Sequence, residues 1–117
     1  MIKILRCTSD NADFQELVKL LDQELALHDG EDYDFYHQFN KIDKIKEAVV
    51  LYENEYPVAC GAIREIVAHH TEIKRMYTRR NFRGKAYAKR ILDELENWAR
   101  ELGYSACRLE TGLRQVE

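Results

Sequence analysis

The chain has 117 residues, of which 45% are hydrophobic and 33% are charged, and its formal net charge is -3. This length can bury one hydrophobic core and is too short for two independent ones, so we expect a single domain over residues 1–117. The slightly negative charge disfavours a general nucleic-acid binder. The apolar start is too short for a signal peptide, and no window approaches the roughly 20 apolar residues of a membrane span.

Three cysteines, Cys7, Cys60 and Cys107, form an odd set without disulfide-framework or metal-ligand spacing. Each lies in an apolar, strand-like run, which predicts buried thiols in a reducing compartment. We therefore expect a cytoplasmic protein without a metal site.

The first part of the chain alternates between strand-like and helix-like segments. Residues 1–7 are a short apolar run that predicts a strand. Residues 8–11 offer several N-cap side chains, and the apolar residues that follow recur at helical spacing up to Leu25. This helix is expected to end near Gly30, and residues 31–46 to form one or two irregular helical turns.

Antiparallel strands are predicted at residues 48–52 and 58–66, because residues 53–57 between them are rich in turn formers. A loop at residues 67–70 would then lead into a further strand at residues 72–79.

The strand at residues 72–79 does not alternate cleanly, since Met76 and Tyr77 are adjacent apolar residues. A β-bulge would reconcile this pattern and would free backbone groups for a ligand. The alternative is an edge strand with mixed burial.

A long amphipathic helix gives the clearest periodicity in the chain. Its apolar stripe consists of Ala88, Ile91, Leu92, Leu95, Trp98, Ala99 and Leu102. Gly103 follows as a C-terminal cap, and residues 105–110 supply a strand. A helix-length crossover joins this strand to the one at residues 72–79, so the two are expected to be parallel neighbours.

The turn at residues 83–88 opens this helix directly after a strand. Backbone N–H groups in the first turn have no partner inside the helix, and the helix dipole adds partial positive charge, so the turn is a candidate anion site. The basic residues around it suit a polyphosphate: Arg79, Arg80, Arg83, Lys85, Lys89 and Arg90. The alternative is an ordinary strand-to-helix connection with a solvated basic rim.

This turn resembles the acyl-CoA motif of the GNAT acetyltransferases, Arg/Gln-x-x-Gly-x-Gly/Ala. Arg83 matches the first position and Ala88 the last, whereas Ala86 stands where the family usually has glycine. Residues 72–77 and 109–112 resemble the strands on either side. The resemblance implies an α/β (α+β) fold, a mixed sheet with the central helix after the fourth strand, in which the family's last helix and last two strands are missing.

The resemblance also implies acetyl-CoA as the cofactor. In the family, the strands flanking the central helix splay apart and the pantetheine arm pairs with strand backbone in the opening. This assigns cofactor binding to Met76, Tyr77, Thr78, Arg83, Gly84, Lys85, Ala86, Tyr87 and Ala88.

The implied chemistry is aminolysis of a thioester. An alkylamine has a pKa near 10 and must lose a proton before it attacks. Glu72 matches the strand glutamate that serves as base in part of the family, and the N–H of Tyr77 is assigned to the oxyanion. Alternatively, Glu72 is an exposed carboxylate paired with Lys74 or Arg64. The family's general-acid tyrosine has no counterpart here.

The expected partner is a small-molecule or peptide amine, with the acidic and aromatic residues 31–36 as its recognition segment. A homodimer through the C-terminal side is also expected. Neither a membrane nor a nucleic acid is expected as a partner. Two other functions stay open: a CoA-binding but catalytically impaired module, and a nucleic-acid or anion-binding domain on the basic cluster. The second has only Tyr77, Phe82 and Tyr87 for base stacking.

Overall fold

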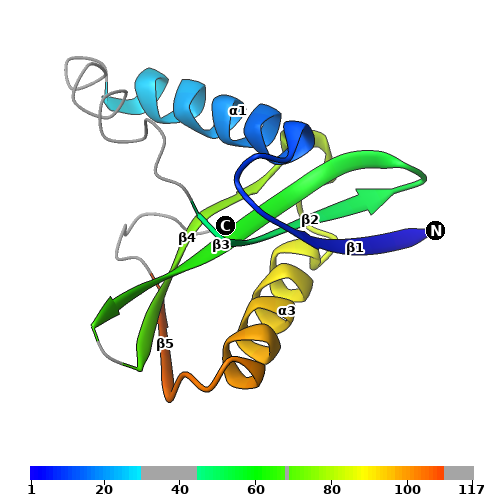
Figure 1. Cartoon of the computed structure of the whole chain (residues 1–117). Helices are drawn as coiled ribbons and strands as arrows, with labels where there is room; N and C mark the ends of the chain where they lie inside the picture. Colours follow the sequence, from blue (N-terminus) through cyan, green and yellow to red (C-terminus); the bar gives the residue numbers. More distant parts are fainter. Residues whose placement is uncertain (30–44, 68, 110–117) are drawn as a thin grey trace.

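The computed structural model describes residues 1–29, 45–67 and 69–109. Their strands form one five-stranded sheet in the order β1-β2-β3-β4-β5 (Figure 1). The elements in chain order are β1 (Ile2–Cys7), α1 (Ala12–Asp29), β2 (Glu47–Glu53), β3 (Tyr56–Val67), β4 (His70–Thr78), the 3-10 turn η2 (Arg80–Phe82), α3 (Tyr87–Glu101) and β5 (Ala106–Leu109). The predicted mixed sheet, with its central helix after the fourth strand, is confirmed.

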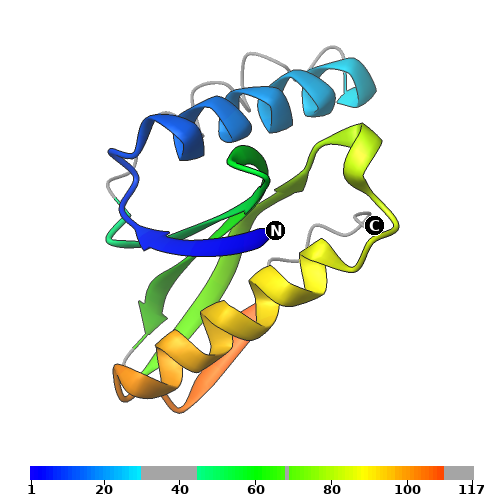
Figure 2. The same cartoon turned by 90° about the vertical axis from the view of Figure 1, so that its right-hand side faces the viewer.

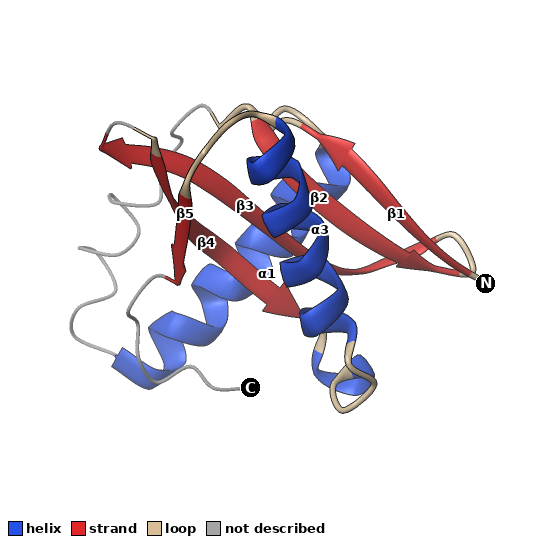
Figure 3. Ribbon diagram, turned by 90° about the horizontal axis from the view of Figure 1, so that it is seen from below, coloured by secondary structure: helices blue, strands red, loops and turns tan. Residues whose placement is uncertain are grey.

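Helices α1 and α3 lie on opposite faces of the sheet (Figures 1, 2 and 3). Alternate residues of the strands supply a separate core on each face. Ile91 and Leu95 of α3 pack with Val49 and Leu51 of β2 on one face. Leu17 of α1 packs on the other face, in a core that also contains Phe14, Ala48, Val50, Cys60, Ala62 and Tyr77. Within the described ranges, neither helix is long and apolar enough to cross a bilayer.

Local capping explains where the helices begin and end. The Asn11 side chain accepts a hydrogen bond of 2.9 Å from the Phe14 N–H, which caps α1. At the end of α3, Gly103 has φ +92°, and its N–H reaches the Arg100 carbonyl at 3.0 Å. The Tyr104 N–H bonds to the Ala99 carbonyl, also at 3.0 Å, which completes a Schellman motif. The predicted glycine cap is confirmed.

The connections on either side of β3 are shorter than the sequence predicts. Asn54 and Glu55 both have positive φ, 51° and 70°, so β2 and β3 are joined by a tight two-residue hairpin turn. Tyr56 therefore belongs to β3 and not to a loop. In the same way, β3 continues to Val67 and β4 begins at His70. Of residues 31–46, where irregular helical turns are expected, residues 31–44 lie outside the described part of the chain, and Ile45 and Lys46 are not helical.

The predicted β-bulge in β4 is confirmed. The register shifts so that Arg75 and Met76 together oppose Gly61 of β3, and Arg75 has φ +59°. Ile73 and Met76 both pack in the α3 core, whereas Tyr77 packs in the α1 core. The extra residue reverses the alternation of side chains, which is why Ile73 and Met76, three residues apart, share one face of the sheet.

The predicted parallel pair is also confirmed. β5 pairs with β4 from His70↔Ala106 to Ile73↔Leu109. Among the described residues, this ladder ends at Ile73, so the second half of β4 has no β5 partner. The open edge of β4 leads to Thr78 and the start of α3, on the side where ligands of α/β sheets bind.

Candidate functional site

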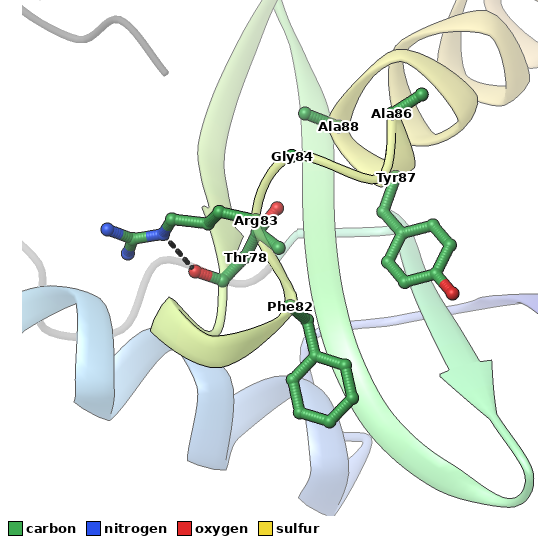
Figure 4. Close-up of a pocket in the computed structure, with 7 residues that line it drawn as sticks. All are labelled: Thr78, Phe82, Arg83, Gly84, Ala86, Tyr87 and Ala88. Atoms are coloured by element: carbon green, nitrogen blue, oxygen red, sulfur yellow. Dashed lines mark hydrogen bonds between the residues drawn. The ribbon is translucent and has the colours of Figure 1, made fainter.

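A cavity of about 370 Å³ lies where β4 ends and α3 begins. Its walls are Thr78, Phe82, Arg83, Gly84, Ala86, Tyr87 and Ala88 (Figure 4). Six of these seven residues were predicted from the sequence to bind the cofactor. Phe82 was not, and it packs at the edge of the α3 core with its ring centroid 6.0 Å from that of Tyr56.

The N-terminus of α3 forms one wall of this cavity. Ala86 is its N-cap residue, no side chain caps it, and its first turn contains no acidic residue. The first N–H bonded within the helix is that of Arg90, which reaches the Ala86 carbonyl at 3.2 Å. The N–H groups of the first turn of α3 thus have no partner within the helix, and their role as an anion site remains a prediction.

The turn that leads into α3 has a left-handed backbone at two positions. Gly84 has φ +86° and Ala86 has φ +65°. Glycine adopts this conformation freely, whereas an L-residue with a Cβ is strained in it. The family's usual glycine at the position of Ala86 therefore has a local conformational reason, which the sequence alone did not reveal.

Replacing Ala86 by glycine is expected to raise the free energy of unfolding by about 0.5–1 kcal/mol, because it removes this strain. The matched control is Ala88→Gly, in the regular first turn of α3, which should lower it by a similar amount. Urea unfolding of both variants measures the difference. An Ala86→Gly protein less stable than the wild type would contradict the assigned backbone strain.

The guanidinium of Arg83 is turned toward Thr78 and away from α3 (Figure 4). Its Nε donates to the Thr78 carbonyl at 2.7 Å. Its Nη2 donates to both carboxylate oxygens of Glu24, at 3.1 Å each, and the guanidinium carbon lies 5.4 Å from the centre of the Tyr77 ring. In this structure the Arg83 side chain thus ties the turn to the end of β4 and to α1.

Glu24 on α1 is the partner of several groups at once. It accepts a hydrogen bond from the Tyr77 hydroxyl at 2.9 Å, and the Arg80 guanidinium lies 3.7 Å away. Burial would raise the pKa of Glu24, but the hydrogen bonds from Arg83 and Tyr77 and the charges of Arg83 and Arg80 lower it below its ordinary value. Burial and the Glu24 carboxylate raise the pKa of Tyr77 to about 12.

A second carboxylate holds the other side of the turn. Glu53, the last residue of β2, accepts a hydrogen bond of 2.7 Å from the Tyr87 hydroxyl, and its carboxylate lies 3.7 Å from the Lys85 ammonium. This hydrogen bond raises the pKa of Tyr87. Tyr87 and Lys85, both predicted to bind cofactor, are thus tied to β2.

Most of the expected basic rim is engaged in ion pairs. Arg79 pairs with Glu16 at 3.1 Å, and Lys89 pairs with Asp93 at 3.2 Å. Together with the partners of Arg80, Arg83 and Lys85, five of the six basic side chains named from the sequence have acidic neighbours. The rim offers less free positive charge than its sequence indicates.

The predicted base lies apart from the cavity walls. Glu72 is half-buried on β4, directly opposite Arg64 of β3. Ile73 beside it packs in the α3 core, so Glu72 projects from the other face of the sheet. It stands six residues before Thr78, about 20 Å along an extended strand. Its catalytic role remains a prediction.

The backbone around the bulge is bonded to the Cys60 thiol. The thiol lies 3.4 Å from the Arg75 carbonyl, to which it donates, and it receives a hydrogen bond from the Tyr77 backbone. Burial raises the pKa of Cys60, so its thiolate is disfavoured. Cys60 is fully buried, as predicted, whereas Cys7 and Cys107 are only half-buried. The Tyr77 N–H, predicted to bind the oxyanion, already has a weak partner on β3.

A parallel strand pair, whose described ladder ends at Ile73, beside a helix N-terminus without a side-chain cap is typical of an α/β protein suited to phosphate-bearing ligands. The sequence model of the Acetyltransferase (GNAT) family matches residues 12–116. The chain belongs to the GNAT acetyltransferase family, as its resemblance indicated.

Individual proteins agree with this assignment. The chain is 41% identical over 60 residues to the IAA acetyltransferase of Azospirillum brasilense, and the match covers 50% of this chain and 39% of that protein. It is 36% identical over 61 residues to the uncharacterized N-acetyltransferase YsnE of Bacillus subtilis (strain 168), covering 52% and 40%. The matched segments therefore span about two fifths of these relatives.

A solved structure matches almost the whole chain. It is that of a protein from Klebsiella pneumoniae subsp. pneumoniae MGH 78578 assigned as an acyl-CoA N-acyltransferase. The TM-score is 0.74 at 25% identity, and the match covers 98% of this chain and 74% of that one. The fold is therefore shared over nearly all of this chain.

Proposed function

We propose that this chain transfers an acetyl group from acetyl-CoA to an amine by direct attack within a ternary complex. The observation that carries the proposal is the cavity at the N-terminus of α3, which no side chain caps, at the end of β4 and beyond its last described pair with β5. Membership of the GNAT family supports the reaction class. The acceptor is expected to be a small-molecule or peptide amine.

The residues at the cavity fit a pyrophosphate followed by an extended arm. Three of the residues that line it at the turn are small, namely Gly84, Ala86 and Ala88, so a phosphate can approach the backbone N–H groups there. The methyl group of Ala86 leaves a phosphate less room beside the backbone than a glycine at this position would leave. The arm would run from Thr78 along the β4 edge, where Met76 and Tyr77 supply backbone groups.

Within this arrangement the chain's residues have two chemical tasks. Glu72 would accept the proton that the amine loses, directly or through a water. The Tyr77 N–H would stabilise the oxyanion by exchanging the Cys60 thiol, a weak hydrogen-bond partner, for a stronger acceptor. The thiolate of CoA has a pKa near 8.5 and leaves with modest help from a general acid.

Cysteine nucleophiles are not needed in this mechanism. Cys60→Ser keeps a hydrogen-bonding group beside Arg75 and Tyr77, so it should retain turnover within about three-fold, and Cys107→Ala should do the same. Cys60→Ala should also retain turnover but unfold more easily, by about 1 kcal/mol, because two buried backbone groups lose a partner.

Initial-rate kinetics with acetyl-CoA and a panel of amines test the proposed function. Intersecting double-reciprocal plots are the expected result, since both substrates bind before transfer. Parallel plots, the ping-pong pattern of an acyl-enzyme, would contradict direct attack. CoA binding without transfer to any amine would favour the catalytically impaired module instead.

Two expectations about partners remain predictions. The acidic segment at residues 31–36, expected to recognise the amine, lies outside the described part of the chain. The expected homodimer involves the C-terminal side, where residues 110–117 are also outside it. Light scattering over a concentration series would test the dimer, and a constant monomer mass at high concentration would contradict it.

A further inference from the structure

Three elements that are distant in sequence meet at one carboxylate beside the cavity. Glu24 belongs to α1, Tyr77 to the end of β4, and Arg83 to the turn before α3. The distances from the Glu24 oxygens are 2.9 Å to the Tyr77 hydroxyl and 3.1 Å to Arg83 Nη2. The side chain of Glu24 is 22% exposed, so these bonds are partly shielded from water.

The turn has little other support on this side. A Cβ added to Gly84 would meet no atom within 4 Å among the described residues, so none of them packs against the turn at that point. Arg83 is bonded on one side to Glu24 and to the Thr78 carbonyl. On the other side, the Tyr87 hydroxyl donates a hydrogen bond to Glu53, and Lys85 forms an ion pair with it at 3.7 Å. Side-chain bonds to two carboxylates thus hold the turn that carries the anion-binding N–H groups.

We propose that Glu24 is a positioning residue for the cofactor: it holds Arg83 and Tyr77 so that the Arg83–Ala88 turn and the end of β4 keep their binding geometry. This inference rests on the proposed function, because it assigns Glu24 to the same acetyl-CoA site. Glu24 itself does not line the cavity, so it acts through Arg83 and Tyr77.

The direction in which CoA affinity changes when the charge of Glu24 is removed separates this positioning role from a purely electrostatic effect. As a negative charge near a polyphosphate, Glu24 would weaken binding, and its removal would tighten it. As a positioning residue it strengthens binding, and its removal weakens it. The two roles predict opposite changes in the dissociation constant for CoA.

Glu16 offers the matched control. It lies on the same helix and pairs with Arg79 at 3.1 Å, but neither residue lines the cavity. Glu16→Gln removes the same charge from the same helix without breaking the contacts of Arg83. The Glu16 side chain is 57% exposed, and such pairs contribute little to stability.

The test is calorimetric titration of CoA into the wild type, Glu24→Gln and Glu16→Gln, with thermal unfolding of each as a folding control. We expect Glu24→Gln to raise the dissociation constant about ten-fold and Glu16→Gln to change it less than two-fold. In an Arg83→Met background, Glu24→Gln should have a clearly smaller effect. Amide hydrogen exchange at Gly84 should also become faster in Glu24→Gln without ligand.

Several results would overturn the inference. Unchanged or tighter CoA binding by Glu24→Gln would do so, as would an equal loss in Glu16→Gln or an undiminished loss in the Arg83→Met background. Should Glu24→Gln fail to fold, Tyr77→Phe removes one of the same bonds at constant charge, and unchanged CoA binding by that variant would count against the inference. A wild type that does not bind CoA at all would overturn the proposed function, and this inference with it.

Discussion

Replacement of Glu72 by glutamine is expected to lower kcat by about 100-fold while leaving the binding of acetyl-CoA unchanged. The amide keeps the size of the side chain and removes its ability to accept a proton. The loss should be largest at the acid end of the pH–rate profile, where the amine is most fully protonated. Steady-state rates between pH 6 and about pH 9 measure it.

The control for Glu72 is Glu65→Gln, which neutralises an exposed carboxylate on β3 in the same hairpin, opposite Thr71. It should leave the profile unchanged. If Glu72→Gln binds acetyl-CoA and also shows the wild-type profile, Glu72 is not the base. Its role would then be the alternative one, a strand carboxylate beside Arg64.

Replacement of Gly61 by valine is expected to give the largest loss of stability, about 3 kcal/mol or more. A Cβ at this position would lie 2.6 Å from Met76 Sδ, 2.7 Å from Ile91 Cγ2 and 3.0 Å from Leu95 Cδ1. Gly61 faces the bulge in β4 and the buried side of α3, where close packing leaves no room. Chemical denaturation measures the loss.

Gly61→Ala provides a graded comparison. It should lower the free energy of unfolding by about 1–2 kcal/mol, less than valine does. The flexible Met76 side chain can move away from the added methyl group, whereas Ile91 and Leu95 can move less. Affinity for CoA should fall in parallel, since Met76 lies in the bulge beside the open edge of β4. A Gly61→Val protein with the stability of the wild type would contradict the close packing of β3 against α3.

Local signals in the sequence predicted most of the fold. The stripe on α3, the cap at Gly103 and the parallel crossover to β5 depend on short-range spacing, and all three are confirmed. The bulge was predictable because the adjacent apolar residues Met76 and Tyr77 interrupt the alternation expected of a regular strand. Leu102, placed in the stripe by its spacing, is 48% exposed, since the helix ends there and the sheet does not cover it.

Interactions between distant segments could not be predicted in the same way. The partners of the basic turn, Glu24 and Glu53, lie 59 and 34 residues away from Arg83 and Tyr87, and no periodicity connects them. From the sequence, Gly61 is an ordinary strand residue. Its close contact with Ile91 and Leu95 of α3 is visible only in the structure. The sequence therefore located the cavity but not the contacts that hold its turn in place.

The most direct test of the proposed site is an amide NMR titration of the chain with CoA, run beside one with a single-stranded oligonucleotide. CoA should bind, with its largest shifts at the amides of residues 84–88 and of Met76 to Thr78 on β4. The oligonucleotide should produce no saturable change, because most of the basic rim is paired with carboxylates. Saturable oligonucleotide binding without CoA binding, or CoA shifts that spare residues 84–88, would contradict a cofactor site at the start of α3.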